Sequence, residues 1–339
     1  MGQEITAERE QTEKRELTKV FKKKGLGQIN ILTRLTNGEY DRVYRIDRVN
    51  DLPLILKIFR NKDEPNREGF GIINTRLVEK GIPTADVLLV EPSSEVFPTG
   101  FMVTSFIEGI DVQDAIKKGE KEGGTEYPEY YKKLGALMKQ VHSITFPKFG
   151  FVGGTEYSTY VEYMKERLAI SFEWTRPLNI FTAEDKISIS NHVLSELENW
   201  SRLPAVLTHG DISPNNCRLN SKNEPVLIDW GDGLSSQIWL YDFSVMTYWM
   251  HWIHESQLGD AEKYRTIFLK DYGKEDLKDS IRSVENAIHL YYAIGLFSYY
   301  KEDDKENEDD EKPNKYEKTV IRFKELIANA KLELPAYFK

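Results

Sequence analysis

Residues 29–107 alternate between short apolar runs and turn residues. Five runs are rich in β-branched or aromatic residues, which is typical of strands in an antiparallel sheet. These runs are Ile29–Leu35, Arg42–Ile46, Leu54–Phe59, Asp86–Val90 and Phe101–Phe106. Between the third and fourth runs, Glu68–Lys80 has helical spacing and ends at Gly81-Ile-Pro83, which combines a C-cap with a helix breaker. The pattern predicts a five-stranded antiparallel sheet with one main helix.

After residue 108 the pattern is mainly helical. Two short strands are expected near residues 217–220 and 226–229. The expected helices are Asp111–Lys118, Glu126–Ser143, Tyr157–Ser171, Ala183–Trp200, Ile238–His254, Asp260–Leu269, Lys278–Tyr300 and Pro313–Lys331. The sequence therefore predicts an α+β fold with two lobes, an N-lobe at residues 28–107 and a C-lobe at residues 108–339. Residues 1–27 are expected to form a charged helix, exposed to solvent, or a frayed arm.

Composition narrows the class of protein. The chain of 339 residues is long enough for two cores, and its net charge of -9 disfavours binding to nucleic acid. The same charge would attract a cationic small molecule, although solubility alone also explains it. With Cys217 as the single cysteine, no disulfide within the chain can form, which fits a reducing compartment. The charged N-terminus and the interruption of Ala287–Tyr300 by His289 argue against a signal peptide and a membrane span, so a cytoplasmic location is expected.

The segment Leu207-Thr-His-Gly-Asp-Ile-Ser-Pro-Asn-Asn-Cys217 carries the strongest chemical signal. Asp211 and Asn216 lie on one tight loop, and Asp229 ends the apolar run Val226-Leu-Ile. An Asp that accepts a hydroxyl proton, with an Asn and an Asp whose oxygens suit Mg²⁺, is the minimal equipment for phosphoryl transfer from a nucleotide. Each carboxylate alone would more often cap a turn or a helix. Their combined spacing favours Asp211 as catalytic base and Asn216 and Asp229 as metal ligands.

Upstream residues supply candidates for binding the nucleotide. Lys57 is a cation in the otherwise apolar run Leu54–Phe59, so it either reaches solvent or meets an anion such as the α- and β-phosphates of ATP. Glu68 opens the following helix and is a candidate partner of Lys57, in competition with Glu64 and Glu79. Alternatively, Glu68 is simply an acidic residue at the N-terminus of the helix, where the helix dipole favours negative charge.

Two backbone segments are further candidates for nucleotide contacts. Asn37 and Gly38, in Thr36-Asn-Gly-Glu-Tyr40, would cover phosphates with N–H groups, but an ordinary hairpin uses the same residues. Thr104, Ser105, Phe106 and Ile107 would form a hinge whose backbone pairs with the adenine edge. Side chains do not decide either assignment.

These residues resemble the aminoglycoside phosphotransferase and choline kinase-like family, which has a protein-kinase-like fold. His209-Gly-Asp211-Ile-Ser-Pro-Asn-Asn216 is similar to its His-Gly-Asp-x-x-x-x-Asn catalytic loop, and Ile228-Asp-Trp-Gly231 to its Ile-Asp-Trp metal-binding segment. The layout around Phe149-Gly-Phe151, read as a turn, looks like that of hygromycin B phosphotransferases. Tyr241-Asp-Phe243 resembles a later family segment in which Asp242 would stabilise the catalytic loop.

The resemblance implies an enzyme that uses ATP and Mg²⁺ to phosphorylate a hydroxyl of a small molecule. Protein-kinase hallmarks such as His-Arg-Asp and Asp-Phe-Gly are missing, which argues against protein substrates. Two acceptors stay open, an aminoglycoside antibiotic and an unidentified metabolite such as an amino alcohol or sugar. A nucleotide-binding pseudokinase and a metal-dependent hydrolase are the competing classes. Five aromatic residues would line the acceptor pocket or belong to the core: Trp230, Trp239, Tyr248, Trp249 and Trp252.

Overall fold

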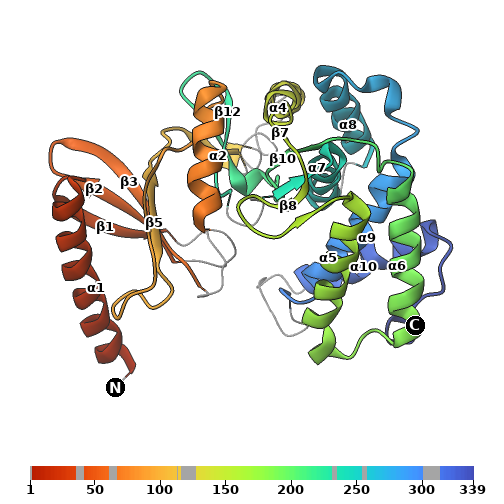
Figure 1. Cartoon of the computed structure of the whole chain (residues 1–339), viewed down its shortest axis with the longest axis horizontal. Helices are drawn as coiled ribbons and strands as arrows, with labels where there is room; N and C mark the ends of the chain where they lie inside the picture. The colour runs from red at the N-terminus through yellow and green to blue at the C-terminus, as the bar shows by residue number, and fades with distance from the viewer. Residues whose placement is uncertain are drawn as a thin grey trace. The chain divides into compact units, whose positions relative to one another are not determined.

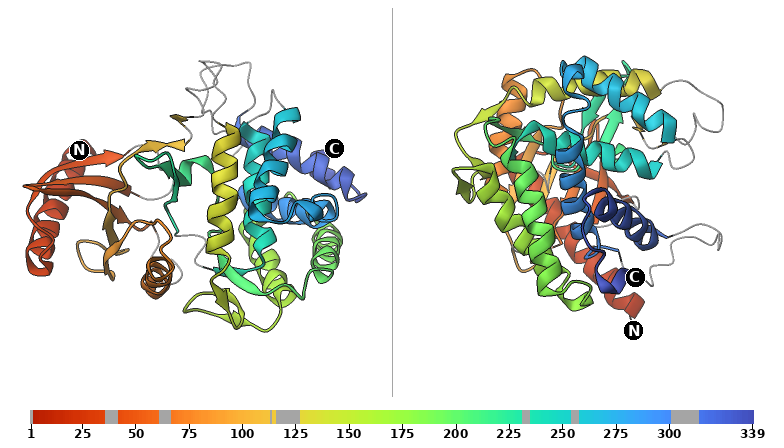
Figure 2. Two further views of the ribbon diagram at one scale, coloured as in Figure 1. Left: turned by 90° about the horizontal axis from the view of Figure 1, so that it is seen from above. Right: turned by 90° about the vertical axis from the view of Figure 1, so that its right-hand side faces the viewer.

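The computed structural model describes residues 2–35, 42–60, 67–112, 114–115, 127–230, 235–253, 258–300 and 314–339. Side chains are described for these residues except 2–10, 67–68, 127, 252–253 and 258–260. The chain forms two compact units. One contains Met1–Gly109 and Val226–Ile228, and the other contains Ile110–Pro225 and Asp229–Lys339. Figures 1 and 2 show the helices and strands of each unit.

The first unit is built on a five-stranded antiparallel sheet of order β1-β2-β3-β5-β4. Its strands are β1 (Ile29–Leu35), β2 (Arg42–Arg48), β3 (Asp51–Ile58), β4 (Val87–Glu91) and β5 (Phe101–Ser105), and the helix α2 (Arg67–Glu79) stands between β3 and β4 in the chain. The predicted strands and helix are therefore all present, with ends that differ from the prediction by at most three residues. Leu227 joins this unit through a parallel bridge to Thr84.

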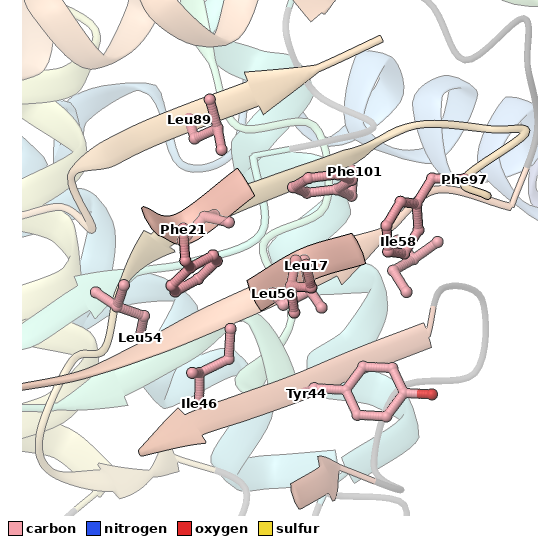
Figure 3. Packing of buried hydrophobic residues seen from close by; sticks show 11 residues of the cluster. Leu17, Phe21, Tyr44, Ile46, Leu54, Leu56, Ile58, Leu89, Phe97 and Phe101 are labelled. Carbon is pink, nitrogen blue, oxygen red and sulfur yellow. The ribbon is translucent and has the colours of Figure 1, made fainter. Parts of the chain in front are cut away.

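The charged N-terminal segment forms the helix α1 (Gly2–Lys24), which lies along one face of the sheet (Figure 1). Leu17 and Phe21 are 1% and 0% exposed, and they point toward Ile46, Leu54 and Leu56 of the sheet (Figure 3). The expectation of an exposed helix or arm is thus wrong for this face of the helix. The reason is that two large apolar side chains one helical turn apart suffice to bury a stripe, even where the neighbouring residues are charged.

An ion pair fixes the register of α1 on the sheet. Arg42 Nη1 and Nη2 donate to the two carboxylate oxygens of Glu13, both at 2.9 Å, and Glu13 is 6% exposed. The hydrogen bonds that Arg42 donates to Glu13 raise the pKa of the Arg42 guanidinium. A bidentate pair of this kind is stronger and more directional than an ordinary surface ion pair. Arg42 opens β2, so α1 is tied to the point where this strand begins.

Alternation along β3 separates the two faces of the sheet. Leu54, Leu56 and Ile58 are buried in the core beneath α1, whereas Ile55 and Lys57 are half-buried on the opposite face. Successive side chains of a strand point to opposite sides of the sheet. Lys57 therefore lies on the face that α1 does not cover.

The second unit is mainly helical. Its helices are α4 (Tyr127–Val141), α5 (Tyr160–Trp174), α6 (Ala183–Glu198), α7 (Trp239–Ile253), α8 (Leu258–Tyr272), α9 (Arg282–Leu296) and α10 (Lys315–Asn329). α4 packs on α8, and α9 packs on α5, α6, α7 and α10, so α9 is the central helix of this unit (Figures 1 and 2). Seven of the predicted helices are found here. α5 begins at Tyr160 rather than Tyr157 because Thr159 and Glu162 form a capping box.

The start of the helical region differs from the prediction. Residues 110–111 form β6 (Ile110–Asp111), which pairs with β11 (Cys217–Leu219), so the expected helix does not begin at Asp111. Arg218 donates to Asp111 at 2.8 Å, which stabilises the pairing and explains the strand. Helical backbone follows at residues 112 and 114–115, and residues 116–118 lie outside the described residues.

Short strands that the sequence analysis did not predict form a second five-stranded sheet of order β7-β10-β13-β8-β9. They are β7 (Thr145–Phe146), β8 (Phe149–Phe151), β9 (Glu156–Tyr157), β10 (Ala205–Thr208) and β13 (Ser235–Gln237). Phe149-Gly-Phe151 is thus a strand rather than a turn. Gly150 has φ +125°, and a Cβ there would lie 2.2 Å from the Thr155 carbonyl oxygen, so this strand requires glycine. Among the described helices, none is long and apolar enough to cross a membrane.

We expect Phe21→Ala to destabilise the first unit by about 3–5 kcal/mol, because it leaves a cavity between α1 and the sheet. Lys23→Ala, on an exposed position of the same helix, serves as the control and should change stability by less than about 0.5 kcal/mol. Chemical denaturation followed by circular dichroism measures both. Equal stability of the two variants would show that α1 does not contribute to the core.

Candidate active site

A buried carboxylate holds the loop that carries the predicted base. β10 is buried along its whole length and leads into His209 and Gly210. The backbone N–H groups of these two residues donate to the Asp242 carboxylate at 2.8 and 2.7 Å. Gly210 has φ +84°, a conformation that glycine adopts without strain. The carboxylate in the first turn of α7 therefore fixes the direction in which the chain leaves β10.

Asp242 also contacts His142, which directly follows α4. His142 Nε2 lies 3.0 Å from Asp242 Oδ2, and His142 Nδ1 lies 2.9 Å from the Tyr272 hydroxyl. Asp242 is 0% exposed, and a buried carboxylate is tolerated when it accepts several hydrogen bonds. Side chains at the end of α4, in α7 and in α8 thus form one hydrogen-bonded chain that holds the loop.

Three side chains donate to the Asp211 carboxylate. The Tyr292 hydroxyl and Trp249 Nε1 lie 3.1 and 3.3 Å from Oδ1, and Asn216 Nδ2 lies 2.7 Å from Oδ2. Trp249 Nε1 is also 3.2 Å from the Tyr292 oxygen. Both oxygens of the predicted base are therefore oriented by the protein.

Burial raises the pKa of the Asp211 carboxyl above its ordinary value. His209 and the hydrogen bonds from Tyr292 and Trp249 oppose this shift, while the charge of Asp229 adds to it. Burial also raises the pKa of the Tyr292 phenol, and the Asp211 charge acts in the same direction, so Tyr292 stays a donor. A carboxylate with a raised pKa accepts a proton more readily, which suits a general base.

Asn216 is placed by its contacts with the same loop. It ends the short 3₁₀ turn η2 (Pro214–Asn216), and its Nδ2 donates to the Asp211 backbone oxygen at 3.0 Å as well as to Oδ2. Because the amide nitrogen faces Asp211, the amide oxygen is the atom left to meet a cation. This orientation fits the predicted role of Asn216 as a ligand for a hard metal ion.

Asp229 follows β12 (Pro225–Leu227) in a strained conformation. Its φ is +60°, in the left-handed region that non-glycine residues seldom adopt. Such conformations cluster at functional sites because the surrounding structure must hold them. The negative charge of Asp229 acts to raise the pKa of the Asp211 carboxyl. His209 is not placed for proton transfer to a substrate, since it is fully buried and packs on Trp230. Its Nδ1 instead accepts a hydrogen bond from the Asp211 backbone N–H, with the two nitrogens 3.3 Å apart.

Among the described residues, no group of three or more His, Cys, Asp or Glu side chains is arranged to bind a metal. Mg²⁺ is usually held by one or two protein ligands together with phosphate oxygens and water. Asn216 and Asp229 supply an amide and a carboxylate oxygen, both ligands that Mg²⁺ accepts. The assignment of Asn216 and Asp229 as ligands of Mg²⁺ stays a prediction.

The predicted nucleotide-binding residues belong to the first unit. Lys57 lies in β3 opposite Met102 of β5, and Thr104 and Ser105 end β5. The N–H groups of Ser105 and Phe106 donate to the Asp86 and Pro53 carbonyls, so they are already used within the sheet. Asn37 and Gly38 lie outside the described residues, and Glu68 is placed only by its backbone in α2.

Sequence reasoning missed two parts of this arrangement. Tyr292 stands 81 residues from Asp211 in the chain and carries no motif, so no spacing signal links them. His142 was not singled out from the sequence, and its contact with Asp242 spans 100 residues. Of the aromatic candidates for the acceptor pocket, Trp239 and Tyr248 are buried core residues, whereas half-buried Trp249 reaches Asp211.

Comparison with solved structures identifies relatives of the same fold. An amicoumacin kinase, hAmiN, superposes with a TM-score of 0.62 at 18% identity, covering 97% of this chain and 96% of the other. The Plasmodium vivax ethanolamine kinase gives 0.60 at 13% identity, with 91% and 84% covered. APH(2'')-IIa in its gentamicin complex gives 0.59 at 15% identity, with 95% and 97% covered. At such low identity these likenesses establish the kinase-like fold. No curated protein matches the sequence significantly.

A sequence model of the phosphotransferase enzyme family matches residues 31–277. The matched range covers parts of both units and contains every predicted site residue, from Asn37 to Asp229. Since the match covers most of the 339 residues, the resemblance inferred from the catalytic loop is confirmed. This protein is an enzyme, and it belongs to the phosphotransferase enzyme family.

Proposed function

We propose that this protein transfers the γ-phosphoryl group of ATP to a hydroxyl of a small molecule with the help of Mg²⁺. The observation that carries the proposal is the Asp211 carboxylate, which is fixed through both oxygens on the loop that also bears Asn216. Phosphoryl transfer needs mainly positioning and stabilisation of charge, and an oriented carboxylate beside a cation site supplies both.

In this proposal Asp211 accepts the proton of the acceptor hydroxyl as its oxygen attacks the γ-phosphorus. Its raised pKa favours proton acceptance, while its hydrogen bonds keep the carboxylate oriented toward the hydroxyl. Asn216 and Asp229 hold the magnesium ion, which neutralises negative charge on the phosphates when bound. The hAmiN structure, determined with AMP-PNP and Ca²⁺, supports a nucleotide together with a divalent ion.

We assign the remaining nucleotide contacts to the first unit. Lys57 contacts the α- and β-phosphates, and Glu68 orients the lysine. Asn37 and Gly38 contribute backbone N–H groups to the phosphates. In the segment Thr104–Ile107, Ile107 is the best candidate to pair with adenine, because the N–H groups of Ser105 and Phe106 are already hydrogen-bonded.

The acceptor is an aminoglycoside-type antibiotic or a metabolite such as an amino alcohol or sugar. One protein of this fold was solved in complex with gentamicin and another is named an ethanolamine kinase, which supports both kinds of acceptor. A panel of aminoglycosides, amino alcohols, sugars and nucleosides, assayed for ADP release in the presence of Mg·ATP, would identify the acceptor. An antibiotic acceptor would make the protein a resistance enzyme, and a metabolite would give it a metabolic role.

We expect Asp211→Asn to lower kcat about 10²–10⁴-fold on the acceptor found in the panel, because the attacking hydroxyl loses its base. The KM for ATP should change little. Asp276→Asn removes an exposed carboxylate of the same unit and should leave kcat unchanged. Steady-state ADP release measures all three proteins. Near-wild-type turnover by Asp211→Asn would contradict the assignment of the base.

We expect Mg²⁺ with a non-hydrolysable ATP analogue to raise the melting temperature of the wild-type protein, because a ligand that binds the folded state stabilises it. Removal of Mg²⁺ by EDTA, or the substitution Asp229→Ala, should abolish most of this shift. Differential scanning fluorimetry measures it. A shift that depends on Mg²⁺ but is never accompanied by ADP release with an acceptor would favour a pseudokinase, and no shift at all would favour a hydrolase.

A further inference from the structure

Two aromatic side chains from different helices meet at a single oxygen of the base. Trp249 comes from α7 and Tyr292 from α9, and both direct their polar atoms at Asp211 Oδ1. The indole N–H also contacts the Tyr292 oxygen at 3.2 Å, so the three groups form a closed triangle. The two rings pack edge to face with centroids 6.0 Å apart. α7 and α9 pack on each other, so the triangle rests on a helix pair of the core.

We propose that Trp249 and Tyr292 are positioning residues that anchor Asp211 through Oδ1 and leave Oδ2 to receive the proton of the acceptor hydroxyl. This assignment rests on the proposed function of Asp211 as the base. In this assignment the two oxygens of one carboxylate have different roles: Oδ1 is held by the protein and Oδ2 accepts the proton.

The hydrogen-bonding capacity of the carboxylate supports this division. An ionised carboxylate has about four acceptor positions, two on each oxygen. The phenol and the indole occupy those of Oδ1, whereas Oδ2 receives one described donor, the Asn216 amide. One position on Oδ2 is left for a hydroxyl. Oδ2 also faces the residue that we assign to the metal, so the hydroxyl is received on that side of the carboxylate.

The exposure of the two aromatic residues supports a role beyond packing. Tyr248, the neighbour of Trp249 in the chain, is fully buried, and Tyr291, the neighbour of Tyr292, is buried against Tyr241. Trp249 and Tyr292 are instead half-buried. Both residues thus keep some solvent exposure, unlike their buried neighbours in the chain.

The test uses the full-length protein and removes one donor at a time. Tyr292→Phe deletes the phenol oxygen and keeps the ring, and Trp249→Phe deletes the indole N–H. Tyr291→Phe is the matched control, since it deletes a phenol oxygen from the adjacent residue, which lies on another side of α9. Asp211→Asn reports separately on the base. The kinetic probe is Mg·ATP with the panel compound that releases most ADP, and slow ADP release with water as acceptor provides a second measurement.

We expect Tyr292→Phe to lower kcat about tenfold to hundredfold, which corresponds to the loss of one hydrogen bond to a charged group. The KM for ATP and the melting temperature should stay close to those of Tyr291→Phe. We expect the double variant Trp249→Phe/Tyr292→Phe to lower kcat by less than the product of the two single fold-losses. The reason is that both donors bind the same oxygen and contact each other. In ¹⁵N NMR spectra, the Trp249 indole signal, identified by its loss in Trp249→Phe, should move in Asp211→Ala and Tyr292→Phe but not in Tyr291→Phe.

Three results would overturn the assignment. If Asp211→Asn is inactive while Tyr292→Phe and the double variant keep wild-type kcat, the positioning role is wrong and the proposed function stands. If Tyr292→Phe loses kcat only in proportion to a lower melting temperature and a higher KM for ATP, the residue is merely structural. If Asp211→Asn retains turnover, the proposed base fails, and the positioning role fails with it.

Discussion

The proposed catalytic loop of this protein depends on one buried carboxylate. Asp242 accepts hydrogen bonds from the backbone of His209 and Gly210 and from the ring of His142, all within 3.0 Å. A carboxylate without these donors would be costly to bury, and the loop without the carboxylate would have buried N–H groups unpaired. The same hydrogen bonds therefore offset both the cost of burying the carboxylate and the cost of burying the N–H groups. These hydrogen bonds fix the direction of the chain at His209 and Gly210. They therefore also determine where Asp211 and Asn216, which follow in the same loop, are placed.

The proposed base, Asp211, shows a balance between burial and hydrogen bonding. Burial raises the pKa of Asp211, and the donors Tyr292 and Trp249 counteract that shift. A carboxylate that was only buried would take up a proton and lose its function as base, whereas one that was only hydrogen-bonded would be a weaker base. The site combines both influences through side chains of α7 and α9. The helical core of the second unit is thus directly connected to the chemistry.

The first unit has a comparable division between its two faces. α1 covers one face of the sheet through Leu17 and Phe21, and the Glu13–Arg42 pair ties the helix to the beginning of β2. The opposite face bears Lys57, the proposed phosphate contact. Because strand residues alternate between faces, the helix that stabilises the sheet does not compete with the lysine.

Local patterns in the sequence determined the strands of the first sheet, the helices of the second unit and the residues of the loop that we propose to be catalytic. These follow from periodicity and from spacing within a few residues, which depend only on neighbouring residues. The short strands β7, β8, β9 and β13 escaped prediction because two or three residues carry no period, and they form only by pairing with distant partners. The burial of α1 and the contacts of Tyr292 and His142 were likewise decided by tertiary structure. Contacts that span 81 or 100 residues arise from packing of whole helices, and a single sequence contains no local record of them.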